Sequence, residues 1–250
     1  MIVSVINLSN GKVSDAEMQA AIRAVNRQVA EDFAPYWGFG GTLRLEGRVS
    51  RGQRKVSQAD MRGDAVLYVH DGEDVDGADG YHDRNFRGIP YGFVFLGLAQ
   101  ALNEAWTVTL SHEALELIGD PEANLLVQGP HPSQPKRRVY HWFEMCDAVQ
   151  AEIYQIDHIK VSNFVLPLYF TSSDERGGRN DFLGTVTKGK TLMSFGVNPG
   201  GYVGFFDPKI RKDDTFYAKH DELAMKRLRI KRRLGTGRGS LRRRRTLGRE

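Results

Sequence analysis

The chain has 250 residues, 40% of them hydrophobic and 26% charged, with a net charge of +4, which is ordinary for a globular protein with one sizeable core. Its single cysteine, Cys146, excludes an internal disulfide and a cysteine-rich zinc site and suits a reducing cytoplasm. Because no apolar run reaches the roughly 20 residues of a membrane span and MIVSVINLSN lacks a basic leader region, we expect neither a membrane protein nor secretion by a signal peptide.

The first predicted elements are a strand and a long helix. Residues 1–8, MIVSVINL, are rich in β-branched side chains and predict the strand. Ser14 with Glu17 three residues later makes a capping box. Apolar residues at helical spacing extend the predicted helix over residues 15–33, and we expect Pro35 and the glycines after it to end the helix.

Three further strands and a second helix follow in the first half of the chain. Alternating or β-branched segments predict the strands at residues 41–49, 65–71 and 89–97. The Gly- and Asp-rich stretch 71–83 lacks the spacing of a calcium-binding EF-hand loop and is interpreted as a solvated loop. A helix is predicted at residues 105–118. A helix that crosses over between strands implies a mixed sheet with helices packed on it, in an α+β protein.

The pattern weakens after Pro121. We interpret residues 131–138 as a polar loop, 139–150 as a strand-to-helix junction or short helix, 158–170 as apolar and extended, and 191–206 as a wrapped loop. The expected organisation is therefore a domain over residues 1–215 whose C-terminal part is irregular, followed by a partly disordered basic tail over residues 216–250.

Residues 109–122, TLSHEALELIGDPE, carry the clearest chemical motif. His112 and Glu116 are four residues apart, so a helix presents both on one face, where they can hold one metal ion. Glu113 lies about 100° round the helix, within reach of a water molecule on that ion, which is the position of the general base in His-Glu-x-x-His hydrolases. The competing interpretation is an ordinary amphipathic helix that contains a His-Glu pair.

A third ligand is needed for a metal site. We favour Glu144, with Asp147 orienting a ligand, because both acids stand among apolar and aromatic residues where unpaired carboxylates are costly. Asp120 is the next choice. His141 is the alternative imidazole, whereas His82 is interpreted as solvated.

Two tyrosines are further candidates for this site, whereas the nearby cysteine and methionine are not. Tyr154 and Tyr169 are possible oxyanion donors, and nothing in the sequence selects between them. Cys146 is expected to be a buried, inert thiol, and Met193 a core residue.

These segments resemble a known family. The element order before His112, together with SHEALELIGDP, FEMCDAV and VSNFVLPLYF, is similar to the zincin-like metallopeptidase domain and to uncharacterised phage and bacterial zincin-like proteins, over about residues 1–170. It departs from the metzincin pattern at Glu116 and Glu122. The resemblance implies a zincin-like fold, a metal-dependent and peptidase-like hydrolase, and a cytoplasmic or virion-associated protein.

The exchange of His for Glu116 affects the expected chemistry. One imidazole with two carboxylates accepts zinc and tolerates manganese better than a His-rich set does. These ligands neutralise a divalent ion and leave less charge to acidify water. We therefore expect weak or narrow hydrolysis, or a metal kept for structure.

The charge of the chain is divided unevenly. Residues 226–250 contain twelve Lys or Arg and one acid, so the remainder carries a net charge of −7. Such arginine density suits non-specific binding to nucleic acid phosphates or to an acidic protein. The alternative function is thus a non-catalytic component of a phage or other particle, whose tail anchors it to nucleic acid or to a shell.

Overall fold

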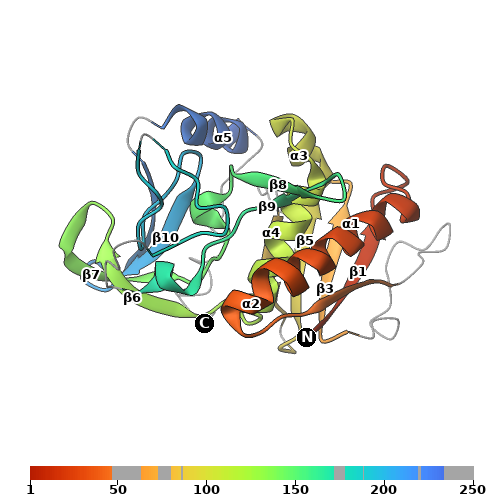
Figure 1. Cartoon of the computed structure of the whole chain (residues 1–250), viewed down its shortest axis with the longest axis horizontal. Helices are drawn as coiled ribbons and strands as arrows, with labels where there is room; N and C mark the ends of the chain where they lie inside the picture. Colours follow the sequence, from red (N-terminus) through yellow and green to blue (C-terminus); the bar gives the residue numbers. More distant parts are fainter. Residues whose placement is uncertain are drawn as a thin grey trace. The chain divides into compact units, whose positions relative to one another are not determined.

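The computed structural model describes residues 1–46, 63–72, 80–85, 87–171, 178–187, 189–218 and 221–233 (Figure 1). These residues form two compact units. Unit 1 lies within Met1–Asp74, Ala78–Ala123 and Ile153–Ser162, and unit 2 lies mainly within Asn124–Glu152 and Asn163–Glu250. The chain is mixed α+β with a mixed sheet, as predicted. The expected boundary at residue 215 stays a prediction, and the two units subdivide the segment that precedes it.

Unit 1 is built on a five-stranded sheet in the order β2-β1-β3-β5-β4. Its strands are β1 (Ile2–Leu8), β2 (Thr42–Leu45), β3 (Ala65–His70), β4 (Gly80–Arg84) and β5 (Pro90–Phe95), and a two-stranded hairpin of β8 (Ile153–Ile156) and β9 (Ile159–Ser162) completes the unit. Strands β2, β1, β3 and β5 run parallel, and β4 pairs antiparallel with β5. The predicted strands at residues 1–8, 41–49, 65–71 and 89–97 are confirmed by β1, β2, β3 and β5.

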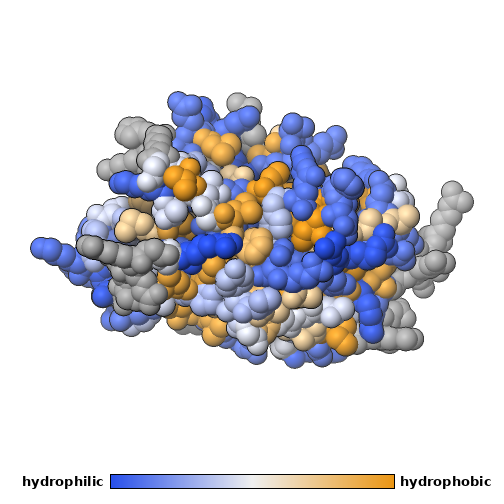
Figure 2. Space-filling view, viewed as in Figure 1, coloured by the Kyte–Doolittle hydropathy of each residue, from blue (hydrophilic) through white to orange (hydrophobic). Residues whose placement is uncertain are grey.

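The first helical region differs from its prediction. Helix α1 (Asp15–Arg27) begins with the expected Ser14 capping box. A π-helix (Gln28–Phe33) and α2 (Ala34–Trp37) follow without a break, so the helical run continues past Pro35. Proline has no N–H to donate to the preceding turn, and the widened turn stands immediately before it. Gly38 then ends the run with a φ of 74°. The exposed residues of α1 are mainly polar, and the surface over α1 is mostly hydrophilic in Figure 2.

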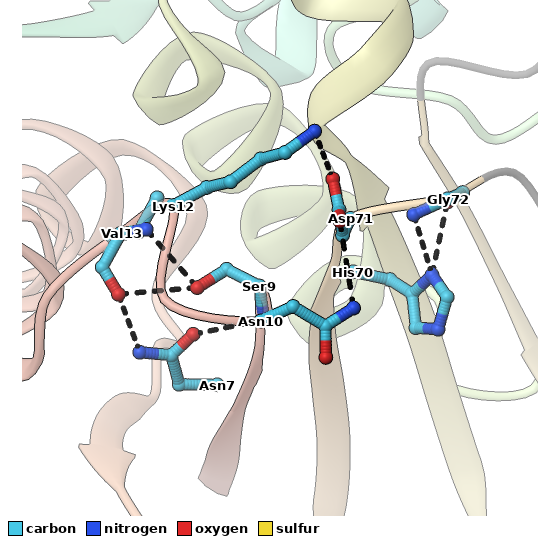
Figure 3. Close-up of polar contacts among 8 residues, drawn as sticks. All are labelled: Asn7, Ser9, Asn10, Lys12, Val13, His70, Asp71 and Gly72. Carbon is cyan, nitrogen blue, oxygen red and sulfur yellow. Dashed lines mark hydrogen bonds and ion pairs between the residues drawn. The ribbon is translucent and has the colours of Figure 1, made fainter.

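A tight turn joins β1 to α1 at the carboxyl end of the sheet. Asn10 and Gly11 have φ angles of 54° and 86°, which Asn and Gly tolerate. Asn7 Nδ2 donates to the Val13 carbonyl at 2.9 Å. Lys12 forms an ion pair with Asp71, which follows β3, so the turn is tied to the neighbouring strand (Figure 3).

Two helices follow the sheet strands of unit 1: α3 (Leu96–Leu102), which was not predicted, and α4 (Trp106–Gly119), which confirms the helix predicted at residues 105–118. Helix α4 packs on the face of the sheet that carries Gly80, because a Cβ there would lie 2.6 Å from Glu113 of α4. Register then places His82, Gly92 and Val94 on the same face. The opposite face carries stacked aromatic rings, such as Tyr68 and Phe93 with centroids 4.9 Å apart.

Unit 2 contains a four-stranded antiparallel sheet in the order β11-β10-β7-β6. Its elements are β6 (Leu126–His131), β7 (Gln134–Trp142), a 3-10 helix (Asp147–Val149), a second 3-10 helix (Pro167–Phe170), β10 (Tyr202–Asp207), β11 (Lys212–Tyr217) and α5 (Glu222–Arg233). The prediction of a loop at residues 131–138 is wrong, because these residues form the turn of a hairpin and the first half of β7. The wrapped loop expected at residues 191–206 holds only up to Gly201, where β10 begins. Residues 139–150 are a strand-to-helix junction, as one of the two interpretations had it.

None of the helices in the described part of the chain is long and apolar enough to cross a membrane.

Candidate metal centre

Helix α4 carries buried polar side chains. His112 is 7% exposed, and Glu113 and Glu116 are fully buried, within a helix whose other residues are almost all buried. The helix ends at Gly119, and Asp120 and Pro121 turn the chain away, as the sequence predicts. The predicted alignment of His112 and Glu116 is present: His112 Nε2 lies 3.2 Å from Glu116 Oε2.

A second imidazole reaches the same carboxylate from the sheet. His82, on β4, places its Nδ1 3.7 Å from Glu116 Oε2 and 3.6 Å from Glu113 Oε2. Its side chain is 8% exposed by residue, so the interpretation of His82 as a solvated loop histidine is wrong. We call His82, His112, Glu113 and Glu116 the α4 cluster; both of its imidazoles lie next to the Glu116 carboxylate.

The close approach of β4 to α4 depends on a glycine. A Cβ built on Gly80 would stand 2.6 Å from Glu113 Oε1, 2.7 Å from Glu113 Cγ and 2.8 Å from the Phe93 carbonyl oxygen. Real Cβ atoms do not approach other atoms so closely, and the carbonyl belongs to the paired strand. Gly80 and His82 share a face of β4, so the small residue lets His82 reach the helix.

Buried hydrogen bonds fix the position of α4 next to the cluster. Ser111 Oγ donates to Gln28 Oε1 at 2.7 Å and accepts from the Ser162 backbone N–H at 3.0 Å. Gln28 Nε2 in turn donates to the Ser162 carbonyl at 2.8 Å. Since Ser111 immediately precedes His112, this network sets the rotation of the helix about its axis and therefore where the His112 ring points.

The phenol of Tyr154 belongs to the same network and not to a reaction site. Its O–H donates to Asp32 Oδ2 at 2.7 Å and accepts from Gln28 Nε2 at 3.1 Å. Burial raises the pKa of Asp32, and the Tyr154 hydrogen bond partly opposes that rise. The role of oxyanion donor suggested for Tyr154 therefore lacks support from its hydrogen bonds.

Asp120 caps α4 and is 4% exposed, and its backbone N–H donates to the Glu116 carbonyl at 2.7 Å. This bond continues the helix and does not bring the Asp120 carboxylate to the cluster, so Asp120 as a ligand stays a prediction. Glu122 lies further out, where its carboxylate pairs with Arg84 at 2.6 Å.

The other predicted ligands belong to unit 2. Glu144 follows β7, Asp147 begins a 3-10 helix, and both are buried. Cys146 is buried too, as predicted. Their role as ligands of an ion on α4 stays a prediction. Met193 is 58% exposed, so the expectation of a core methionine there is wrong.

The donor types of the α4 cluster fit a divalent cation. Imidazole nitrogen and carboxylate oxygen are both zinc ligands, and two imidazoles with one carboxylate is a donor set of catalytic zinc sites. The sequence revealed His112, Glu113 and Glu116 but not His82. The only sequence feature that could have indicated His82 is its position two residues after Gly80, which puts both on one face of the five-residue strand β4. Comparisons with protein-family models, with curated proteins and with solved structures each find no match to this chain.

Proposed function

We propose that unit 1 is a metal-dependent, peptidase-like hydrolase whose ion is held by His82, His112 and Glu116. The observation that carries this proposal is the convergence of two imidazole nitrogens on one oxygen, with Glu116 Oε2 lying 3.2 Å from His112 Nε2 and 3.7 Å from His82 Nδ1. A cation at this point offsets the electrostatic repulsion and desolvation cost of two adjacent buried carboxylates. Zinc suits the mixed nitrogen and oxygen donors, and manganese is the alternative ion.

Glu113 is the general base in this proposal. A divalent ion supplies Lewis-acid activation of a water molecule and of the scissile carbonyl. Glu113 Oε2 lies 3.6 Å from His82 Nδ1, next to the proposed ligands, and accepts the proton of that water. The Gln28–Ser111–Ser162 network holds α4, so the helix does not have to reorganise during the reaction.

His82 changes the chemistry expected from the sequence. A site with one imidazole and two carboxylate ligands neutralises a divalent ion, whereas two imidazoles and one carboxylate leave one net positive charge on it. That charge favours ionisation of the bound solvent near neutral pH. The proposal is therefore an active hydrolytic site and not a purely structural ion. Glu144, Asp147 and Asp120 remain sequence-based candidates for a further ligand.

The arrangement of unit 1 also supports a zincin-like fold, which we include in the proposal. A crossover helix follows β1, an antiparallel strand closes one edge of the sheet, and the His-Glu helix packs on the sheet face. This order agrees with the resemblance noted in the sequence.

Metal stoichiometry tests the proposal. Protein purified without chelator and exchanged into metal-free buffer should carry about one zinc or manganese ion per chain by plasma mass spectrometry. His82→Gln, His112→Gln and Glu116→Gln should each lower this content and weaken zinc affinity, as loss of a direct ligand does. His70→Gln is the matched control, because His70 is not part of the α4 cluster; its Nδ1 accepts a hydrogen bond from the Gly72 backbone N–H at 3.0 Å.

Two results would contradict the proposal. Folded protein that retains no divalent ion after reconstitution would remove the metal site altogether. If only the His82→Gln variant binds zinc as tightly as the His70→Gln control, His82 is not a ligand and the charge argument fails.

A second function is favoured by the charge distribution, and we propose it as the alternative. Unit 2 continues into α5, which carries Lys226 and Arg229 at the start of the basic segment. Residues 234–250 of the expected tail lie outside the described residues. In this proposal the protein is a non-catalytic component of a phage or other particle, and residues 226–250 anchor it to nucleic acid or to an acidic shell protein.

Salt-dependent binding distinguishes these partners. Replacement of the arginines at positions 242–245 by Gln should weaken DNA binding and flatten its dependence on salt concentration, because each phosphate contact contributes to that slope. DNA affinity that persists after deletion of residues 226–250 would rule out the tail as the anchor.

A further inference from the structure

One face of strand β7 carries a row of basic and aromatic side chains that the proposed hydrolase does not use. Alternate residues of a strand point to the same side of the sheet. Every second residue from Gln134 to Trp142 is exposed or half-buried, whereas Val139 and His141 between them are buried. We call the outward side chains the β7 row, which consists of Lys136, Arg138, Tyr140 and Trp142. Two cations are thus followed by two aromatic rings along one line.

The neighbouring strands widen the β7 row into a surface of unit 2. Strand β7 lies between β10 and β6 (Figure 1). The register places Phe206 of β10 beside Tyr140 on the same face, where Phe206 is half-buried. On the other side, Leu126 of β6 lies beside Trp142 and is 42% exposed. Tyr140 itself is 36% exposed, so this aromatic face is open to solvent at its centre.

The end of the sheet next to Arg138 is positively charged. An ion pair between Arg137 and Asp207 holds the turn that joins β10 to β11 beside β7. That turn and the start of β11 add three exposed cations, Lys209, Arg211 and Lys212. Residues 134–140 and 207–214 together contain six Lys or Arg and three Asp, so this end is basic although the chain up to residue 225 is acidic as a whole.

We propose that this face of unit 2 binds single-stranded nucleic acid, with bases stacked on the rings and phosphates next to the cations. Every base has a π-face, so aromatic rings displayed on a sheet accept unpaired bases of any sequence. The cations of the β7 row neutralise the phosphates that lead away from the stacked bases. Alternate residues of a strand are about 7 Å apart, which is close to the spacing of successive nucleotides in an extended single strand.

The combination of rings and cations selects this ligand over others. A neutral sugar stacks on rings but has no use for Lys136 and Arg138, and an acidic peptide pairs with the cations but leaves the Tyr140 ring unused. A duplex keeps its bases stacked on one another, so the rings do not reach them. The proposal depends neither on hydrolysis nor on residues 226–250, which contain no aromatic side chain.

Three oligomers that differ in their bases test this surface on the full-length protein. The first is a thymidine oligomer of about 15 nucleotides, near the upper site size of one single-strand-binding domain. The second is an abasic oligomer with the same number of phosphates, and the third is the duplex of the thymidine oligomer with its complement. Each carries a fluorescent label, and binding is followed by anisotropy in the presence of EDTA. The basic tail contributes to the binding of all three, so the comparison is made between variants for each probe.

Variants at Tyr140 separate stacking from charge. Tyr140→Leu keeps an apolar side chain without a ring, and it should weaken binding of the thymidine oligomer about tenfold while leaving the abasic oligomer and the duplex unchanged. Tyr140→Phe keeps the ring and should bind like wild type. Tyr36→Leu, at an exposed tyrosine of unit 1, is the matched control. If circular dichroism shows that Tyr140→Leu is unfolded, Phe206→Leu tests the neighbouring ring in the same way.

A variant at Arg138 tests the phosphate contacts. Arg138→Gln should weaken binding of the thymidine oligomer and of the abasic oligomer alike. It should also lower the slope of log affinity against log salt concentration by about 0.7, the contribution of one phosphate contact on a single strand. An unchanged slope would mean that the cations of the β7 row do not contact phosphates and would overturn that part of the proposal.

Three further outcomes would overturn the proposal. Unchanged binding of the thymidine oligomer in a folded Tyr140→Leu variant means that bases do not stack on this face and that other parts of the chain contact nucleic acid. An equal loss for the abasic oligomer means that the ring only supports the cations. A loss of polyglutamate binding as large as that of the thymidine oligomer means a surface for an acidic protein.

Discussion

Unit 1 and unit 2 each bury imidazole beside two carboxylates, but the hydrogen bonds of the imidazoles differ. In the α4 cluster, nitrogens of His82 and His112 face Glu116 Oε2 at 3.7 and 3.2 Å. In unit 2, His141 on β7 lines a small recess with Glu144 and Asp147; its Nε2 proton is directed to a backbone carbonyl, and Nδ1 has no hydrogen-bond partner among the described residues. The first arrangement concentrates ligand atoms around one carboxylate oxygen. The second commits one imidazole nitrogen to the backbone.

This difference shows that residue types alone do not determine the chemistry of a buried polar site. A metal ion needs donor atoms that converge within its coordination radius, and an imidazole nitrogen that donates its proton to a backbone carbonyl is not one of them. The partner of each ring nitrogen decides whether that nitrogen can bind a metal. The following four variants test whether the two sites are as distinct as their geometry indicates.

The largest expected effect is on turnover. Glu113→Gln should lower the rate of peptide hydrolysis by about 10²–10⁴-fold, because the amide cannot accept a proton. The variant should keep its zinc. Turnover is measured with a fluorogenic peptide pool on the zinc-loaded protein, with the exposed Glu122→Gln as control. A wild-type rate equal to that of Glu113→Gln would refute hydrolysis at this site.

A methyl group on β4 should disturb only the α4 cluster. Gly80→Ala places a Cβ against Glu113 and the Phe93 carbonyl, and should cost about 1–3 kcal/mol of unfolding free energy and weaken zinc binding. Urea unfolding and zinc titration measure the two effects. Gly72→Ala is the control, since a Cβ there lies 3.5 Å from the nearest atom of His70. A stable Gly80→Ala protein with unchanged zinc affinity would show that β4 need not lie so close to α4.

The network behind α4 gives a smaller effect. Gln28→Ala removes the partners of Ser111 Oγ and the Ser162 carbonyl, and should lower the unfolding free energy by about 2 kcal/mol. Zinc affinity should fall with it because the helix loses its fixed rotation. The exposed Gln19→Ala on α1 is the comparison. Zinc affinity unaffected by Gln28→Ala would mean that the ligands hold their positions without the network.

The smallest effect concerns the pH dependence of stability. Burial holds the folded-state pKa of His141 below its unfolded value, so its contribution is present above about pH 6.5 and is lost as pH falls through that value. The difference in unfolding free energy between wild type and His141→Asn should therefore shrink by about 1 kcal/mol or less between pH 7.5 and 5.5. A difference that stays constant over this pH range would mean that folding does not lower the pKa of His141.

The sequence predicted the elements whose patterns are local. Helix α4 was placed within one residue at each end, because a continuous apolar face precedes a Gly-Asp-Pro stop. That placement also fixed the approach of His112 to Glu116, since four residues make about one turn. The capping box of α1 was likewise found from Ser14 and Glu17 alone.

The sequence could not predict features that depend on a partner strand. Strand β4 occupies Gly80–Arg84, in a stretch whose glycines and acids are typical of a loop, and only pairing with β5 makes it a strand. His82 was missed for this reason. The hairpin of β6 and β7 was missed because Pro132 and Pro135 suggested a loop. Pro132 lies in the turn of the hairpin, and Pro135 lies near the start of β7, ahead of Tyr140 and His141, where β7 pairs with β10.

The β8–β9 hairpin, at residues 153–162, belongs to unit 1 although the chain reaches it only after a long excursion into unit 2. Ser162 supplies a hydrogen bond to Ser111, so unit 1 cannot complete the support of α4 until residue 162 has been synthesised. At about 5–20 residues per second, the ribosome takes several seconds to pass from residue 123 to residue 162. During that interval the nascent chain exposes an apolar helix, and a chain truncated after residue 123 would expose it permanently.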